Sequence, residues 1–468
     1  ENVLAIDAML ADGSKAHFGP ITADLSDLAD GSPLKPLARD LFALGAREAS
    51  EIAARFPKVQ RRVGGYNIDS LVPGRNDVNL AHILVGSEGT LAFSTAIDLK
   101  LSPILGKRAV GACHFGSFHE AMAAAQHLVK LAPIAVELVD ATMISLAREI
   151  AMFRPTLDAF IQGEPQAVLL VEFAEPEWAE NERRLVRLHE LMGDLGFAWK
   201  HSGDYWGGVV DVLDPKLQAA ITELRTAGLN IMMSMKDQGK PISFVEDCAV
   251  PLEHLADYTA RLTDVFHKNG TTGTWYAHAS VGCLHVRPIL NLRLEKDVKA
   301  MRNIAEEAFA FVREYKGSHS GEHGDGLVRS EFNEPMFGSR LARAFEEVKD
   351  RFDPNGLFNP GKIVPGPQDF RIETNLRQGA DRAIPLPFSP VLAFAAKDES
   401  FIAQYLSPRL IREFRLFAVA DHESKSDLAV DSIHDEAGYR RVRKLLAMQH
   451  SMEERVPDVQ IQRYSRDG

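Results

Sequence analysis

The sequence is poor in cysteine, with only Cys113, Cys248 and Cys283 among 468 residues. Three widely separated cysteines can form neither a disulfide framework nor a four-thiolate cluster, so we expect a reducing compartment and a cytoplasmic protein. Apolar runs of the ~20 residues needed to cross a bilayer are also lacking. We therefore expect no transmembrane segment, and any association with the inner membrane would be peripheral, through a partner.

Positively charged residues are also fewer than negatively charged ones. The chain has 53 Lys and Arg against 65 Asp and Glu, a formal net charge of -12. Such a chain repels phosphate backbones, so we expect no nucleic-acid partner. Hydrophobic residues make up 45% of the sequence, which excludes a disordered chain, and the length suggests roughly three cores.

The first hundred residues predict part of a domain. Apolar alternation on both sides of Asp12-Gly13 predicts a β-hairpin, residues 26–57 have helical spacing, and glycine-rich turns alternate with short apolar runs over 60–104. A hairpin alone buries too little surface to be stable. We therefore expect the remainder of this domain upstream of Glu1.

From residue 105 the sequence alternates between strand and helix patterns. Strands are predicted at AVGACHF, QAVLLVEFA and ISFVEDCAVP, and a capping box at Ser117 and Glu120 begins the first of the helices between them. This order predicts an α+β domain with an antiparallel sheet and helices on one face.

The last part of the chain differs in character. Helices are predicted over 296–316 and 335–352, and the second ends at Asp353-Pro354-Asn355-Gly356. Residues 382–392 are broken by prolines, and 436–456 form a charged helical pattern with a basic cluster, interpreted as a solvated helix face. We interpret this tail as a linker, an interface element or a partly unfolded segment.

One constellation has the composition of a metal site. His278 and His285 flank Val281-Gly282, and a two-residue turn there would place them directly opposite each other. Glu322, between glycines in GEHGDG, can supply a carboxylate, and two imidazoles plus one carboxylate form a catalytic zinc set. His323 beside it is a candidate general base. The alternatives are histidines that are close by chance and a competing thiolate from Cys283.

Two further features suggest binding. A tight turn of small and polar residues follows the apolar strand LAHILV and could hold a phosphate or a flavin edge, or be an ordinary turn: Gly86, Ser87, Glu88, Gly89 and Thr90. A carboxylate substrate near a metal needs a cationic partner. Arg287, close to His285, is the first candidate, and Lys236 and Lys240 are the others.

Taken together, VGSEGTLAFST, the two histidines, GEHGDG and FDPNGLFNPGKI resemble the FAD-linked oxidases of the vanillyl-alcohol oxidase superfamily. The resemblance covers about residues 1–366 and points to the branch of D-lactate dehydrogenase, the glycolate oxidase flavin subunit and D-2-hydroxyglutarate dehydrogenase. It is strongest to large bacterial members fused to an iron–sulfur region.

The resemblance implies the C-terminal part of a two-lobed FAD-binding domain (1–104 and 335–366), an inserted ferredoxin-like cap domain (105–334) and a tail of uncertain structure (367–468). It implies that the Gly86–Thr90 turn and Asn359 border FAD, and that His278, His285 and Glu322 match the metal ligands. His323 would stand next to the substrate. The family's glycine-rich pyrophosphate loop would lie upstream of Glu1, so we expect a truncated form of a larger protein.

The resulting hypothesis is oxidation of a D-2-hydroxy acid to the 2-oxo acid, dependent on FAD and a divalent metal, zinc by ligand type. The expected partners are a small 2-hydroxy-carboxylate substrate and an electron acceptor, either an iron–sulfur protein or a quinone-linked one. Two alternatives remain. One is a flavin-free zinc hydrolase with the same ligands, and the other is a catalytically inactive fragment that serves as a binding or assembly module.

Overall fold

The structure is a computed structural model that describes residues 2–74, 78–199, 205–233, 235, 238–366, 371–374 and 376. The chain divides into two units, Glu1–Ala380 and Asp381–Gly468, and the description below concerns the first. The predictions for 382–392, for the helical pattern over 436–456 and its basic cluster Arg440, Arg441, Arg443 and Lys444, and for Lys236 lie outside the described residues.

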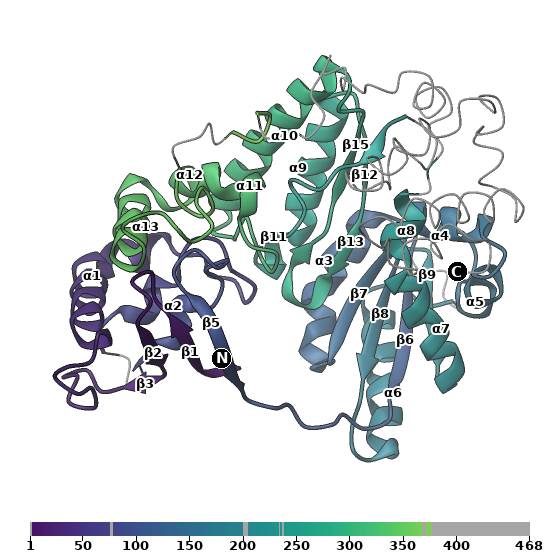
Figure 1. Ribbon diagram of the computed structural model, residues 1–468. Helices are drawn as coiled ribbons and strands as arrows, with labels where there is room; N and C mark the ends of the chain where they lie inside the picture. The colour runs from purple at the N-terminus through teal and green to yellow at the C-terminus, as the bar shows by residue number, and fades with distance from the viewer. Residues whose placement is uncertain are drawn as a thin grey trace, which may run out of the picture. The chain divides into compact units, whose positions relative to one another are not determined.

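The described chain contains both strands and helices (Figure 1). The strands are β1 (Val3–Met9), β2 (Lys15–Phe18), β3 (Pro20–Ile21), β4 (Val78–Asn79), β5 (Phe93–Leu99), β6 (Ala109–Phe115), β7 (Ala135–Asp140), β8 (Ala167–Phe173), β9 (Gly207–Val212), β10 (Lys240–Pro241), β11 (Cys248–Ala249), β12 (Gly273–Thr274), β13 (Tyr276–His278), β14 (Cys283–Leu284) and β15 (Arg287–Leu290). The α-helices are α1 (Leu34–Arg55), α2 (Ala81–Leu84), α3 (Phe118–Leu128), α4 (Ala141–Glu149), α5 (Arg154–Phe160), α6 (Trp178–Asp194), α7 (Pro215–Thr226), α8 (Gly228–Met233), α9 (Leu255–Lys268), α10 (Glu295–Glu314), α11 (Gly326–Arg329), α12 (Asn333–Phe337) and α13 (Ser339–Phe352). Short 3-10 helices are η1 (Ile68–Leu71), η2 (Val129–Leu131), η3 (Leu252–His254), η4 (Ala279–Val281) and η5 (Ser330–Phe332).

The N-terminal hairpin is confirmed. Strands β1 and β2 pair antiparallel around a turn in which Gly13 N–H donates to the carbonyl of Leu10 at 2.9 Å. Strand β5 pairs with the other edge of β1, which gives a sheet of order β2-β1-β5. Buried residues of this sheet and of α1 and α13 belong to the larger of the two hydrophobic clusters.

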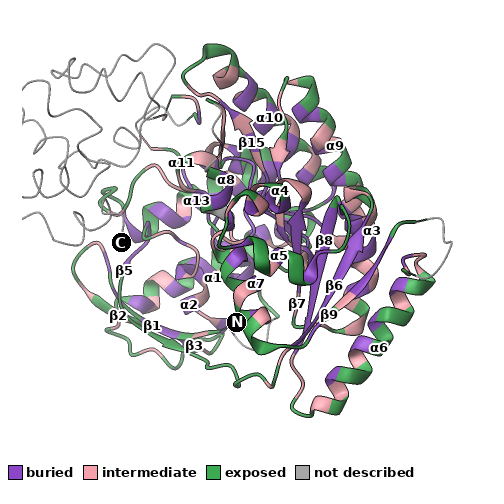
Figure 2. Ribbon diagram, turned by 90° about the vertical axis from the view of Figure 1, so that its right-hand side faces the viewer, coloured by how far each residue is buried: buried purple, intermediate pink, exposed green. Residues whose placement is uncertain are grey.

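The antiparallel sheet predicted after residue 105 is also confirmed, with the order β11-β14-β13-β7-β8-β6-β9. Helices cover both of its faces, however, and not one as predicted. Leu169 packs in a cluster with residues of α3 and α6, whereas Leu170 packs in a cluster with residues of α4, α5 and α7. The physical reason is that β6 and β8 are buried at every residue, so neither face can be left to solvent (Figure 2).

Local signals around this sheet have mixed outcomes. The capping box is confirmed, because Ser117 Oγ accepts from Glu120 N–H and the Glu120 carboxylate accepts from Ser117 N–H. The strand predicted for ISFVEDCAVP is reduced to Cys248–Ala249. The extended run stops because Asp247 adopts a left-handed backbone, with φ of 75°.

Asp140 fixes the end of β7. Its carboxylate accepts from Met143 N–H at 2.8 Å, which caps α4, and from Trp275 N–H at 3.1 Å, next to β13. The side chain is buried, and burial raises its pKa to about 6. It therefore links helix α4 to the strand that carries the first histidine.

The raised pKa of Asp140 predicts a pH-dependent stability. The native state holds this proton more tightly than the unfolded chain does, so the contribution is present in acid and is lost as the pH rises from about 4 to about 6, by about 3 kcal/mol at most. In urea unfolding, the free energy of unfolding of Asp140→Asn should rise relative to that of the wild type as the pH increases across that window. The control is Asp214→Asn, at the exposed N-cap of α7, for which this difference should stay constant. Parallel pH profiles for wild type and Asp140→Asn would contradict the assignment.

Within the part of the chain that is described, no helix has both the length and the hydropathy to span a bilayer.

Candidate active site

His278 ends strand β13, and His285 directly follows the adjoining strand β14 of the large sheet. Residue His278 pairs with Cys283, and His285 N–H donates to the carbonyl of Tyr276 at 2.6 Å. The histidines are therefore diagonal neighbours on one face, with ring centroids 5.1 Å apart, and the prediction that they stand directly opposite each other is wrong.

The turn between the strands explains this register. It contains the 3-10 helix η4 and ends at Gly282, which has φ of 66°, so it is longer than the predicted two-residue turn. A Cβ at Gly282 would lie 2.1 Å from the carbonyl oxygen of Val250. Only glycine fits this position, and the longer turn shifts the pairing while keeping both imidazoles on the same face.

A buried carboxylate shapes the loop that presents Glu322. Asp247 accepts from Glu322 N–H at 2.9 Å and from His323 N–H at 2.8 Å. With the loop held in this way, the Glu322 carboxylate lies 3.6 Å from His278 Nε2 and 3.8 Å from His285 Nε2. The structure thus brings together the three side chains that the sequence nominated.

The donor set fits a divalent metal ion. One nitrogen or oxygen from each of His278, His285 and Glu322 lies within 4.8 Å of the others. Two imidazoles and a carboxylate are the ligands of a catalytic zinc site with an open position. Cys283 is a weaker candidate, because burial raises the pKa of its thiol far above the usual range and a ligand must be the thiolate.

Arg61 reaches the same carboxylate, a contact that sequence reasoning missed. Its Nε lies 3.4 Å from Glu322 Oε1, and the side chain is half exposed. Its segment runs beside the loop of Glu322, since Val63 N–H donates to the carbonyl of Ser320 at 2.9 Å. A guanidinium here adds positive charge at the rim of the site.

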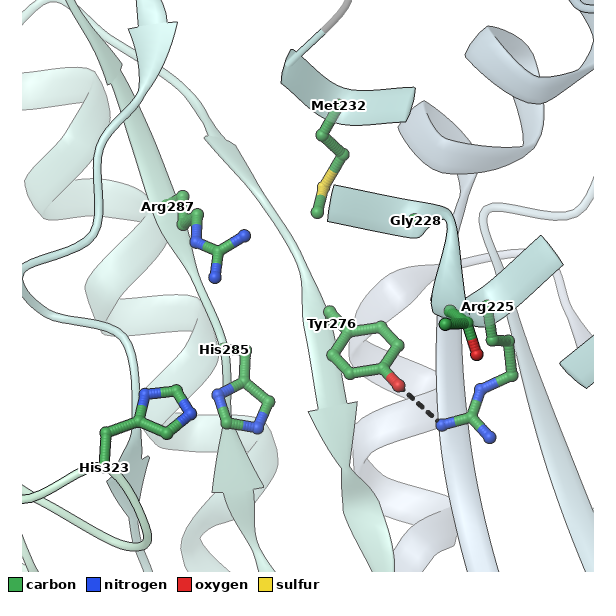
Figure 3. Close-up of a pocket in the computed structure, with 8 residues that line it drawn as sticks. Arg225, Gly228, Met232, Tyr276, His285, Arg287 and His323 are labelled. Carbon is green, nitrogen blue, oxygen red and sulfur yellow. Dashed lines mark hydrogen bonds between the residues drawn. The ribbon is translucent and has the colours of Figure 1, made fainter. Parts of the chain in front are cut away.

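A pocket of about 260 Å³ opens next to the histidines. It is lined by Arg225, Thr226, Gly228, Met232, Tyr276, His285, Arg287 and His323. Figure 3 shows His285 and His323 on one side of it and Tyr276 with Arg225 on the other. A small cavity with two guanidinium groups suits a small anionic ligand.

Arg287 is held by Glu246, another residue that the sequence did not single out. Arg287 Nε donates to Glu246 Oε2 at 2.6 Å, and both side chains are largely buried. Burial opposes ionisation of Glu246, but the hydrogen bond with His323 and the charge of Arg287 outweigh it and lower its pKa to about 2. The carboxylate therefore stays ionised and keeps the guanidinium in place.

His323 and His285 stack with ring centroids 5.0 Å apart. His323 Nδ1 lies 3.5 Å from Glu246 Oε1, and this interaction raises the pKa of His323. Burial, with the nearby charge of His278, lowers the pKa of His285 to about 4. The His323 ring thus favours holding a proton, while the His285 ring stays neutral, as a metal ligand must be.

The turn at 86–90 contacts the same loop from the other side. The Glu88 carboxylate accepts from Asp325 N–H at 2.6 Å and from Gly326 N–H at 2.9 Å, and Asn359 Nδ2 donates to the Glu88 carbonyl at 2.8 Å. The predicted flavin-bordering residues are therefore adjacent to one another. Not all of the turn's amides face outward as expected, because Ser87 N–H donates to the carbonyl of Leu84 in helix α2 and Thr90 N–H donates to the carbonyl of Ser87.

Lys240 is engaged elsewhere. Its Nζ donates to the carbonyl of Met235 at 2.6 Å, and its strand β10 pairs with β15. It lies outside the set of residues that line the pocket. The structure thus provides Arg225, and not Lys240, as the second cation of this cavity.

The large sheet carries His278, and His285 and Glu322 lie close to it beside a small pocket that contains two arginines. The chain belongs to the FAD-linked oxidases: the family profile "FAD linked oxidases, C-terminal domain" matches residues 105–363, more than half of the chain.

Two named dehydrogenases are similar to this chain, and one solved structure aligns with it. The chain is 30% identical over 397 residues to a D-2-hydroxyglutarate dehydrogenase of Pantoea ananatis, covering 82% of this chain and 38% of the relative. It is 27% identical over 305 residues to a D-lactate dehydrogenase of Archaeoglobus fulgidus, covering 64% and 61%. A solved structure, 4-ethylphenol oxidase from Gulosibacter chungangensis, aligns at 12% identity with a TM-score of 0.49 over 78% of this chain and 66% of that one. The chain thus spans 38% of the length of the first of these relatives.

The C-terminal region matches a different family. A profile described as "SpoVR like protein" matches residues 390–455. Over 65 residues the chain is 45% identical to an uncharacterized protein of Escherichia coli, covering 14% of this chain and 13% of that protein. This region therefore has relatives distinct from those that match residues 105–363.

Proposed function

We propose that the protein oxidises a D-2-hydroxy acid to the corresponding 2-oxo acid, with a substrate of the D-2-hydroxyglutarate type preferred over D-lactate or glycolate. The observation that carries the proposal is the convergence of His278, His285 and Glu322 beside a pocket that contains Arg287 and Arg225. A dicarboxylate has an anionic group for each arginine, whereas lactate and glycolate have only one.

In this proposal FAD supplies a hydride acceptor and a divalent cation supplies a Lewis acid. His278, His285 and Glu322 would hold the cation, while Gly86–Thr90 and Asn359 would border the flavin. Arg287, fixed by Glu246, binds the carboxylate next to the hydroxyl carbon and so orients its α-hydrogen. His323 accepts the hydroxyl proton, and Glu246 stabilises the resulting imidazolium.

Replacing Arg287 tests the proposal. With FAD and zinc added to the purified full chain, we expect dye reduction with D-2-hydroxyglutarate and none with the L enantiomer. Arg287→Met should lower kcat/KM by about 10- to 100-fold, because a charge-assisted hydrogen bond is worth about 1.5–3 kcal/mol. Arg293→Met, an exposed arginine on the same segment, is the matched control and should change little.

Three outcomes would contradict the proposal. No flavin uptake and no dye reduction with any D-2-hydroxy acid would favour the inactive binding module. Zinc-dependent ester or amide hydrolysis without flavin would favour the hydrolase. Equal kcat/KM values for Arg287→Met and Arg293→Met would remove Arg287 from the site.

A further inference from the structure

Glu137 is a carboxylate in the middle of strand β7, between apolar neighbours. It lies on β7, where the register places it directly opposite His278 on β13. Its neighbours Val136 and Leu138 are fully buried, and the Glu137 residue itself is 8% exposed. A charge in such a position is costly unless it is paired and hydrogen-bonded.

The contacts of Glu137 extend in two directions. On one side its carboxylate oxygens lie 2.9 and 3.0 Å from Nδ1 of His278. On the other, Arg225 Nη2 donates to it at 2.6 Å and also donates to the hydroxyl of Tyr276 at 2.7 Å, the bond drawn in Figure 3. The carboxylate thus stands between a candidate cation ligand and two residues of the pocket wall.

The chemistry of this contact fixes the state of the imidazole. An ionised carboxylate can only accept a hydrogen bond, so neutral His278 must carry its proton on Nδ1. The lone pair is then on Nε2, the atom that lies 3.6 Å from Glu322. A carboxylate behind a histidine also makes the ring a stronger ligand, and such outer partners contribute roughly 10- to 100-fold in metal affinity.

We propose that Glu137 is a positioning residue that fixes the Nδ1–H tautomer of His278 for cation binding and, through Arg225, joins the cation site to the wall of the substrate pocket. This inference rests on the proposed function, since it takes His278 to be a ligand. It adds to the site a residue from a separate strand, β7.

Glu137→Gln is the informative variant. Glutamine has the same size but can donate as well as accept, so it no longer enforces one tautomer. The full chain should then bind zinc 10- to 100-fold more weakly in competition with a chromogenic chelator. Glu172→Gln is the matched control, because Glu172 is a buried glutamate on the neighbouring strand β8 that pairs with Arg108. Its zinc affinity should equal that of the wild type.

A second readout needs no metal. In histidine-labelled, metal-free protein, nitrogen-15 spectra should show neutral His278 as the Nδ1–H tautomer in the wild type and in Glu172→Gln, and a mixture in Glu137→Gln. The signals lost in His278→Ala identify the residue.

The outcomes separate the inference from the proposed function. Unchanged zinc affinity in Glu137→Gln, or an equal loss in Glu172→Gln, overturns the inference while the metal site stands. A wild-type chain that binds no zinc overturns the proposed function together with the cation-binding part of the inference, while the tautomer of His278 still decides whether Glu137 fixes the state of the imidazole.

Discussion

Replacement of His278 by alanine is expected to abolish both zinc binding and turnover while leaving the fold intact. Zinc affinity should fall by more than about 100-fold, since loss of a direct ligand exceeds the 10- to 100-fold effect of an outer partner. The fold should survive because Glu137 keeps its ion pair with Arg225 at 2.6 Å, so no buried charge is left unpaired. The cost in unfolding free energy should be about 1 kcal/mol.

The measurement for His278→Ala is the zinc content after dialysis, together with dye reduction and circular dichroism. His189→Ala is the matched control, because this histidine on α6 also pairs with a carboxylate, Asp211 at 2.9 Å, but its side chain is exposed. Wild-type zinc content in His278→Ala would refute the metal assignment. Zinc loss in His189→Ala would show that the assay reports general damage.

Lys349→Met is expected to cause the largest loss of stability. The Lys349 ammonium is buried and donates to the carbonyl oxygens of Thr90 at 2.6 Å and Phe358 at 2.8 Å, and it pairs with Asp353 at 2.5 Å. Methionine fills the space but leaves the buried Asp353 carboxylate without its cation. Removing one partner of such a pair costs about 3–5 kcal/mol.

Urea unfolding of Lys349→Met is compared with that of Lys299→Met. Lys299 also pairs with an acid one helical turn away, Glu295, but its side chain is 71% exposed, so its loss should cost no more than about 0.5 kcal/mol. Because Lys349 also joins the 86–90 turn to the segment of Asn359, its loss should weaken FAD binding as well. Equal stability of the two lysine variants would contradict the role of the buried ammonium.

Some of the candidate site could be predicted from sequence because its signals are local. Two histidines near one turn and a glutamate between glycines can be recognised without any knowledge of the fold. Glu137 could not be found in this way, since it meets His278 only through the pairing of β13 with β7, 141 positions away in sequence. Arg225 and Glu246 are similar cases, single charges whose partners come from other elements.

In the fold, too, local features could be predicted from sequence and long-range ones could not. The hairpin at Asp12-Gly13 and the capping box at Ser117 follow from neighbouring residues, and both form. The two-sided cover of the sheet has a local signal in AVLLV, which is a continuous apolar run, whereas a strand with one solvent-exposed face alternates between apolar and polar residues. The register of the histidines depends on turn length, which a glycine alone does not define.

The double anchoring of the loop around Glu322 has a consequence for folding kinetics. Asp247 holds one end of this loop and Glu88 the other, and Glu88 is 237 positions away from Asp325. Contacts of such long range form late, because chain closure must be complete before they contribute. Ligand affinity should therefore emerge only in the last phase of refolding, after the helical signal has recovered, and it offers a stricter criterion of complete folding than secondary structure does.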